Sequence, residues 1–163
     1  MKIYTKQGDN LKTKTINNEV YKSDLIIEVN GTIDELQAHL MLSYNFIDNQ
    51  EIKEIILSIC KDLFIVGYDI TSSKETFSID KVTSLELLID KYNDTLKPLT
   101  EFIVPGLTKP SSILHVTRTV ARRCERVIVR YALDHDINKA ILKYINRLSD
   151  LLFILARFTE EYK

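Results

Sequence analysis

Three arginines recur at four-residue intervals in the second half of the chain, Arg118, Arg122 and Arg126, and His115 lies about one helical turn before them. Residues with this spacing lie along one face of a helix, where each pair of like charges costs roughly a few tenths of a kcal/mol. A bound phosphate chain would offset that repulsion, because a guanidinium group donates two parallel hydrogen bonds to phosphate oxygens. The row therefore indicates either an anion-binding face or a solvated face with Glu125 and neighbouring acids as counter-ions.

The polar segment from residue 1 to about 22 holds a second set of groups suited to phosphate. Glycine lets a backbone approach a phosphate closely, while threonine hydroxyls and lysine ammonium groups bind its oxygens. The candidates in this segment are Thr5, Lys6, Gln7, Gly8, Thr13, Lys14 and Lys22. Lysine and threonine are also common in polar tails, so a tail without a ligand is the alternative.

Asn146 is expected in the middle of a helix, within the segment from Tyr144 to Asp150. Asparagine is a poor helix former, because its side chain competes with the helix for backbone hydrogen bonds. Its presence there indicates either a ligand contact or a hydrogen bond to a neighbouring helix.

The sequence offers no protein side chains that we would assign to a metal ion. A ferritin-like di-iron site needs paired Glu-x-x-His motifs on facing helices, and none of His39, His115 and His135 has a glutamate three residues before it. Cys60 and Cys124 lie in separate helical patterns without metal-ligand spacing. This arrangement is typical of reduced thiols in a cytoplasmic protein.

The elements that must position these residues are helices, because apolar residues recur at intervals of three and four along most of the chain. Thr32 and Glu35 offer a late start for the first helix, but the apolar stripe runs through Gly31 and favours a longer one. Five helices are expected. The first runs from residue 25 to about 47 after an Asp24 cap, and the second runs from a capping box at Asp48 and Glu51 to about 70. The third runs from about 80 to 96, the fourth from Pro110 to about 131, and the fifth from an Asn138 cap to about 156.

The fold class that follows is all-α, a five-helix bundle with an N-terminal extended arm. Only four Gly and three Pro are present, which favours a few long elements, and no segment shows a convincing strand pattern. We expect a single domain over residues 1–163, with an arm at 1–22 and the helical bundle at 24–162.

The segment 97–109 is expected to be a loop, because Pro98, Pro105 and Gly106 punctuate it. It nevertheless contains the apolar run Phe102 to Val104, which is unusual in an exposed loop.

The charge balance excludes one class of partner. The 22 basic and 23 acidic side chains give a formal net charge of −1, so the broad basic surface of a nucleic-acid-binding protein is missing. Residues 1–8 lack the apolar core of a signal peptide, and no apolar run reaches the roughly 20 residues that cross a bilayer. We therefore expect no membrane partner and a cytoplasmic location.

Taken together, four blocks of sequence resemble the PduO-type ATP:cob(I)alamin adenosyltransferases. Their order and spacing match that family from one end of the chain to the other. The blocks are Lys2–Lys6 with Gly8–Asp9, Gly31–Leu36, Phe102 with Pro105–Gly106 and His115–Arg126, and Asn146–Phe153.

The resemblance implies a five-helix bundle that forms a homotrimer, with active sites between neighbouring subunits. It implies transfer of the 5′-deoxyadenosyl group of ATP, with Mg²⁺, to the cobalt of a cob(I)alamin or related corrinoid, forming adenosylcobalamin and releasing triphosphate. Reduced cobalt is itself the nucleophile, so no activated serine, cysteine or histidine is required. A non-catalytic ATP- or corrinoid-binding bundle, such as a sensor or chaperone, is the alternative.

The resemblance also implies residue roles. Arg118 would pair with Asp34 across the subunit boundary, and Phe102 would lie beside the corrin ring and displace its lower axial base. A reductase and an adenosylcobalamin-dependent acceptor enzyme would be further partners. The nucleotide would be bound by Thr5, Lys6, Gln7, Gly8, Thr13, Lys14 and Lys22 of one subunit and by Arg122, Arg123, Glu125, Arg126 and Asn146 of the facing one.

The chain departs from the family pattern at three places. Leu11 replaces the second glycine of the arm, and Leu107 replaces the second glycine of the loop. Ile26 and Asn30 replace residues that the family has before Gly31. Because Leu11 could change how the arm closes on phosphate, the assignment of Thr13 and Lys14 as ATP contacts is the one that depends most on the resemblance.

Overall fold

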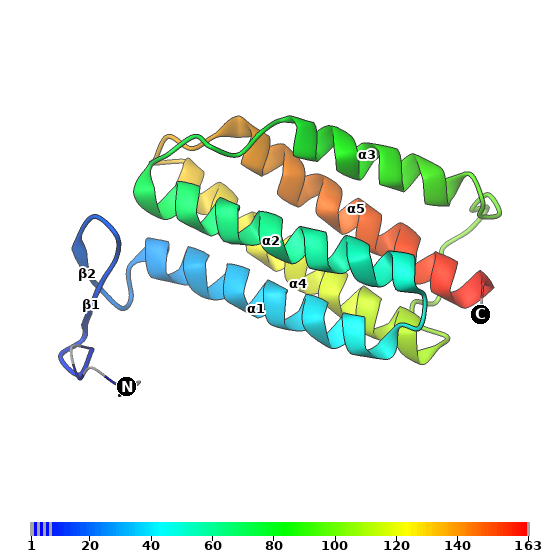
Figure 1. Ribbon diagram of the computed structural model, residues 1–163, viewed down its shortest axis with the longest axis horizontal. Helices are drawn as coiled ribbons and strands as arrows, with labels where there is room; N and C mark the ends of the chain where they lie inside the picture. The colour runs from blue at the N-terminus through cyan, green and yellow to red at the C-terminus, as the bar shows by residue number, and fades with distance from the viewer. Residues whose placement is uncertain (1, 3, 5, 7, 163) are drawn as a thin grey trace.

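The computed structural model describes residues 2, 4, 6 and 8–162. Within them the chain forms an elongated bundle of five helices, which confirms the predicted fold class (Figure 1). The helices are α1 (Leu25–Phe46), α2 (Gln50–Ser72), α3 (Asp80–Asn93), α4 (Lys109–Ala132) and α5 (Lys139–Glu161). Among the described helices, none combines the length and the apolar character needed to cross a membrane.

Side-chain caps fix where most of these helices begin. The Asp24 carboxylate accepts a hydrogen bond from the Ile26 amide at 3.0 Å, and α1 continues without a break through Gly31, so the longer first helix was the right prediction. The predicted cap of α2 was wrong by one residue. Asn49, not Asp48, caps α2, because its side-chain oxygen accepts from the Ile52 amide at 3.1 Å.

The other boundaries follow the same rules. Thr108 caps α4, with Pro110 in the first turn, and the Asn138 oxygen accepts from the Ala140 amide at 2.9 Å at the start of α5. The prediction for α3 ran too far, since the helix ends at Asn93. Leu96 nevertheless remains buried.

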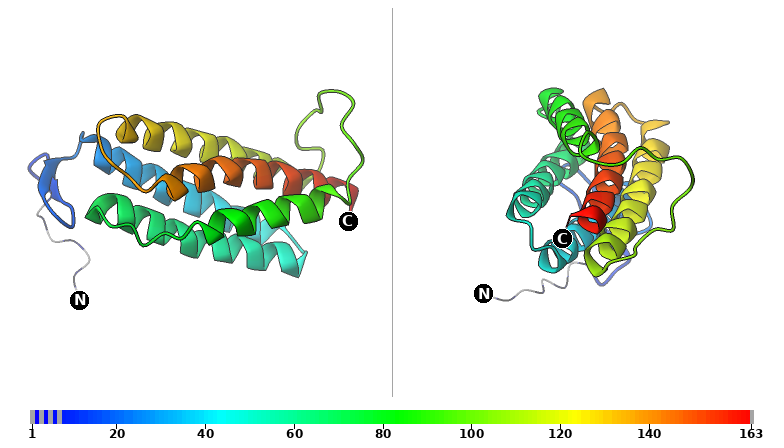
Figure 2. Two further views of the ribbon diagram at one scale, coloured as in Figure 1. Left: turned by 90° about the horizontal axis from the view of Figure 1, so that it is seen from above. Right: turned by 90° about the vertical axis from the view of Figure 1, so that its right-hand side faces the viewer.

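The bundle is built around α4 and α5. Helix α5 packs against α3 and α4, and α1 packs against α4 and α2, so the arginine-bearing helix lies between α1 and α5 (Figure 2). The predicted apolar stripe of α4 is buried, including Val120, Ala121 and Cys124. Cys60 is also buried, and both thiols are free.

The arm contains strands that the sequence did not predict. Strand β1 (Lys12–Lys14) pairs antiparallel with β2 (Glu19–Tyr21), with Thr13 opposite Val20. Strands of three mostly polar residues carry no apolar alternation, so periodicity could not reveal them. The hairpin projects beyond the N-terminal end of α1 (Figure 1). A hydrogen bond from Asn17 Nδ2 to the Thr71 carbonyl (3.3 Å) attaches it to α2.

Candidate active site

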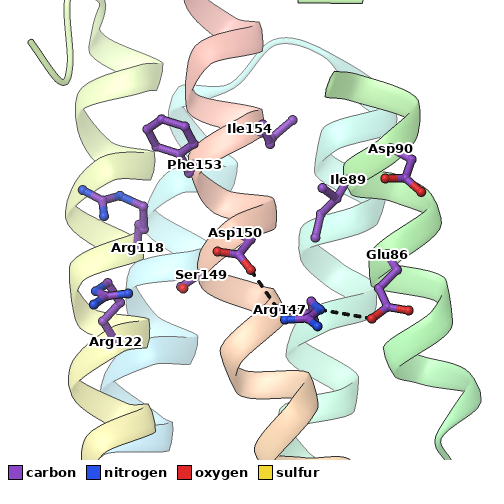
Figure 3. A pocket seen from close by; sticks show the side chains of 10 residues that line it. All are labelled: Glu86, Ile89, Asp90, Arg118, Arg122, Arg147, Ser149, Asp150, Phe153 and Ile154. Carbon is purple, nitrogen blue, oxygen red and sulfur yellow. Dashed lines mark hydrogen bonds and ion pairs between the residues drawn. The ribbon is translucent and has the colours of Figure 1, made fainter. Parts of the chain in front are cut away.

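Two members of the arginine row, Arg118 and Arg122, line a cavity of about 440 Å³ between α3, α4 and α5, and Arg126 does not. Figure 3 shows Arg118 and Arg122 one above the other on α4, with Arg147 of α5 across from them. Arg147 is already neutralised, since its Nε lies 3.0 Å from Glu86 of α3 and its Nη1 lies 3.9 Å from Asp150. Arg118 and Arg122 form no ion pair among the described residues. Of the three arginines that line this cavity, they are therefore the two that remain available to a ligand.

A second cavity of about 520 Å³ adjoins the first and is mainly apolar. It lies between the α3–α4 loop and the neighbouring turns of α4 and α5. Arg118 and Phe153 line both cavities and form their common wall. The second cavity is lined by Leu99, Glu101, Phe102, Ile103, Pro105, His115, Arg118 and Phe153. A charged cavity, lined by three arginines and three carboxylates, thus adjoins an apolar one.

Arg118 is held in an unusual environment at this wall. Its guanidinium carbon lies 5.9 Å from the centre of the Phe153 ring, and its buried Nε has no hydrogen-bond partner. The predicted partner, Asp34, is exposed on α1 and forms no ion pair within the described part of the chain.

His115 contributes a neutral side chain to the apolar cavity. It is 5% exposed, its ring meets the edge of Phe153 with centroids 5.9 Å apart, and both ring nitrogens lack partners. Burial lowers the pKa of His115, the positive charge of Arg118 lowers it further, and Glu160 opposes this to a smaller extent. The imidazole therefore adds no further positive charge next to Arg118 at neutral pH.

The rest of the predicted nucleotide site divides between two faces of α4. Arg123 turns towards α1 and forms an ion pair with Glu35. Arg126 is exposed, and its Nη1 donates to the Arg122 carbonyl at 3.0 Å. The structure therefore does not place Arg123 with Arg118 and Arg122 at the cavity.

Asn146 forms the inter-helix hydrogen bond that was one of its two predicted roles. Its Nδ2 donates to Glu125 Oε1 of α4 at 2.9 Å, and its Oδ1 accepts from Arg147 Nη1 at 2.9 Å. The side chain is exposed, so a ligand could still reach it after exchanging one of these partners.

The N-terminal candidates lie apart from the arginine row. Lys22 covers Gly8, where a Cβ in place of the glycine hydrogen would lie 3.2 Å from the lysine Nζ, so these two residues are brought together. Lys6 is exposed, and Thr13 and Lys14 lie on β1. The predicted contacts of Thr5 and Gln7 fall outside the described residues. No hydrogen bond or ion pair joins the described arm residues to Arg122 or Asn146.

Leu11, which stands where the family pattern has a glycine, adopts a backbone conformation that favours glycine. Its φ is +64°, in the left-handed region that favours glycine, and its side chain is 75% exposed. The residue therefore keeps the turn of the arm at the cost of backbone strain and an exposed apolar group.

Phe102 is 104% exposed, so it makes no contribution to the core of the chain. An exposed aromatic ring at the mouth of an apolar cavity suits a large flat apolar ligand. Sequence reasoning did not single out Arg147, Phe153 or Glu86 individually. The first two lie in the block around Asn146, whereas Glu86 carried no signal on the polar face of α3.

The fold and site define an α-helical protein that places two arginines without ion-pair partners beside an apolar cavity. The chain belongs to the cobalamin adenosyltransferase family, whose model matches residues 3–159. It is 36% identical over 165 residues to a corrinoid adenosyltransferase from Bacillus subtilis, covering 96% of this chain and 86% of the relative. It is 34% identical over 167 residues to one from Citrobacter freundii, covering 98% and 95%.

Solved structures give the same result. A variant PduO-type ATP:corrinoid adenosyltransferase from Lactobacillus reuteri, complexed with ATP, matches with a TM-score of 0.93 at 34% identity, covering 98% of this chain and 94% of that one. A second variant of that protein, complexed with cobalamin and ATP, matches with a TM-score of 0.91 at 34% identity, covering 98% and 91%.

Proposed function

We propose that this protein transfers the 5′-deoxyadenosyl group of ATP to the cobalt of cob(I)alamin, forming adenosylcobalamin and releasing triphosphate. The observation that carries the proposal is the wall that Arg118 and Phe153 form between a charged cavity, where Arg118 and Arg122 have no ion-pair partner, and an apolar one. The reaction needs a polyanion and a large corrin ring to meet at one point, and the two adjoining cavities suit these two substrates.

On the nucleotide side, Arg122 is proposed to bind the triphosphate and to stabilise it as it leaves. The backbone that carries Arg122 is fixed by the buried face of α4 before any substrate arrives, which limits the reorganisation needed during the reaction. Arg126, Glu125 and Asn146 would contact the rest of the nucleotide.

Mg²⁺ is proposed to enter with the nucleotide. The described residues contain no group of three His, Cys, Asp or Glu side chains placed to hold a metal ion. Two of the three carboxylates that line the cavity pair with Arg147, and the unpaired Arg118 and Arg122 suit phosphate oxygens and not a cation. When bound, Mg²⁺ would neutralise further charge on the triphosphate.

On the corrinoid side, Phe102 is proposed to lie against the lower face of the corrin ring and displace its axial base. Loss of that ligand makes Co(II) easier to reduce to the nucleophilic Co(I) state. His115 is neutral and its nitrogens are buried, so it leaves this face apolar. The protein orients the substrates, and the cobalt supplies the bond-forming electron pair, which attacks the ribose 5′ carbon.

We further propose that the site is completed in a homotrimer. The arm of one subunit would reach the arginine row of the next, and Asp34 of one would pair with Arg118 of the other. Among the described residues, no hydrogen bond or ion pair joins the arm to Arg122, and neither Asp34 nor Arg118 forms an ion pair, which supports this arrangement. The enzyme is proposed to work in the cytoplasm, with a reductase supplying the electron and an acceptor enzyme receiving adenosylcobalamin.

The direct test is an anaerobic assay with ATP and chemically reduced hydroxocobalamin. We expect the absorbance spectrum of adenosylcobalamin to appear with one triphosphate released per product. Binding of ATP without turnover under these conditions would instead indicate a non-catalytic sensor or chaperone.

A further inference from the structure

The loop between α3 and α4 is fastened at both of its ends to the last turns of α5. At its start, Arg157 Nη2 donates to the Lys97 carbonyl at 2.6 Å, and Arg157 is only 6% exposed. At its end, the Glu160 carboxylate accepts a hydrogen bond from the Leu107 amide at 2.9 Å. Between these anchors the loop carries the fully exposed Phe102.

The anchor at the end of the loop depends on one atom. Glu160 Oε1 accepts from the Leu107 amide and also from the Ser111 hydroxyl, in the first turn of α4. Hydrogen bonds to a carboxylate are roughly twice as strong as those between neutral groups. A single oxygen of α5 therefore holds both the loop end and the helix that follows it.

The chain next to this anchor has little freedom to move. Gly106 has φ +88°, and a Cβ at this position would lie 2.8 Å from Ser112 Oγ. The Ser112 hydroxyl also donates to the Gly106 carbonyl at 2.8 Å. The Leu107 peptide thus follows a closely packed turn, and its direction sets the path of the residues before it.

Those preceding residues form one side of the apolar cavity. Phe102 and Pro105 line it from the loop, and Phe153 lines it from α5. Glu160 lines neither cavity. Besides its charge, which acts on His115, it can affect the cavity through the loop that it holds.

We propose that Glu160 is a positioning residue for corrinoid binding, which holds the end of the loop so that Phe102 and Pro105 face Phe153. This inference rests on the assignment of the apolar cavity to the corrinoid. Leu107 stands where the family resemblance has a second glycine, and its side chain is 74% exposed. The bond from its amide to Glu160 restricts a position where glycine would leave the backbone freer.

The test uses three variants of the whole protein. Glu160→Ala removes the shared acceptor, and Glu160→Gln keeps one oxygen that can accept both bonds. Thr159→Ala is the control, because that hydroxyl donates to the Ala156 carbonyl of its own helix. Ser111→Ala, which removes one of the two bonds, provides a milder variant should Glu160→Ala fold poorly.

Hydrogen exchange of the Leu107 amide and the affinity for cob(II)alamin in the presence of ATP are the two readouts. We expect Glu160→Ala to speed the exchange and to weaken cob(II)alamin binding by roughly 10-fold, as two hydrogen bonds are lost. ATP affinity should stay unchanged. Thr159→Ala should match the wild type. Glu160→Gln, whose neutral oxygen accepts weaker bonds, and Ser111→Ala should lie between the wild type and Glu160→Ala.

Unchanged exchange in Glu160→Ala, or faster exchange with unchanged cob(II)alamin affinity, would overturn the positioning role. Phe102→Ala, measured in parallel, separates this failure from a failure of the proposed function. If Phe102→Ala also leaves cob(II)alamin binding unchanged, the assignment of the cavity to the corrinoid is wrong. If only Phe102→Ala weakens binding, that assignment stands and the role of Glu160 does not.

Discussion

The arginine row of α4 and the N-terminal arm carry similar chemistry but are held in different ways. Val120, Ala121 and Cys124 are buried beneath the row, so Arg118 and Arg122 are placed by the packing of the bundle. The arm is a short hairpin that projects from the N-terminal end of α1, and the Asn17 side chain attaches it to α2. The backbone of the row is therefore in place before ATP arrives, whereas in the proposed trimer the arm would reach the row of a neighbouring subunit.

The largest expected effect is on the preformed side. Arg122→Ala should lower turnover by roughly 10²-fold or more, because a preorganised charge aimed at the leaving phosphate is lost. Arg130→Ala is the matched control, since Arg130 lies on the same helix but pairs with Glu28 away from both cavities. Steady-state kinetics and thermal melting of both variants make the comparison. Near-normal turnover by a folded Arg122→Ala would indicate that the row is a solvated face.

The second test reverses the charges proposed to meet between subunits. Asp34→Arg should weaken assembly and activity, because it places a cation next to the unpartnered Arg118 of a neighbour. Combining it with Arg118→Asp should restore part of the loss, measured by light scattering and turnover. A double variant no better than the worse single one would argue that the two side chains do not meet.

The third prediction concerns the other extended segment, the Phe102 loop. Truncating a buried phenylalanine costs about 3–5 kcal/mol, but Phe102 is wholly exposed, so Phe102→Ala should melt almost like the wild type. It should lose most activity when cob(II)alamin must be reduced on the enzyme and retain more when cob(I)alamin is supplied. With ATP bound, the variant should also lack the spectrum of four-coordinate Co(II). An unchanged spectrum would remove the proposed role of Phe102.

The smallest effect is expected at the edge of the row. Asn146→Ala should weaken ATP binding by about 1–2 kcal/mol, the value of one hydrogen bond, with little change in the rate constant of the bound complex. Isothermal titration gives the affinity and saturating kinetics the rate. A large fall in turnover at saturating ATP would mean that Asn146 acts in the transition state.

Much of this architecture follows from local rules that a sequence displays. Helical periodicity and capping chemistry predict α1, α4 and the start of α5 closely, but α5 runs to Glu161, about five residues beyond its predicted end. They miss the start of α2 only because Asp48 and Asn49 are both good caps. The three-residue strands of the arm lie below the reach of periodicity.

The site was predictable only in part. The spacing of Arg118 and Arg122 places them on one face, and the structure brings them together at one cavity. The sequence could not show that Arg123 pairs with Glu35 or that Glu86 pairs with Arg147, because such pairs depend on how distant helices pack. Glu160 was missed for the same reason, since its partner Leu107 lies 53 residues away in the chain.

The central claim, that the arm and the row act together only between subunits, is tested most directly by mixing two inactive variants. One carries Lys6→Ala with Lys22→Ala in the arm, and the other carries Arg122→Ala in the row. After unfolding and refolding together in equal amounts, about a quarter of the sites in a head-to-tail ring would combine an intact arm with an intact row. We predict activity near a quarter of the wild-type level, and a mixture as inactive as its two components would contradict the account.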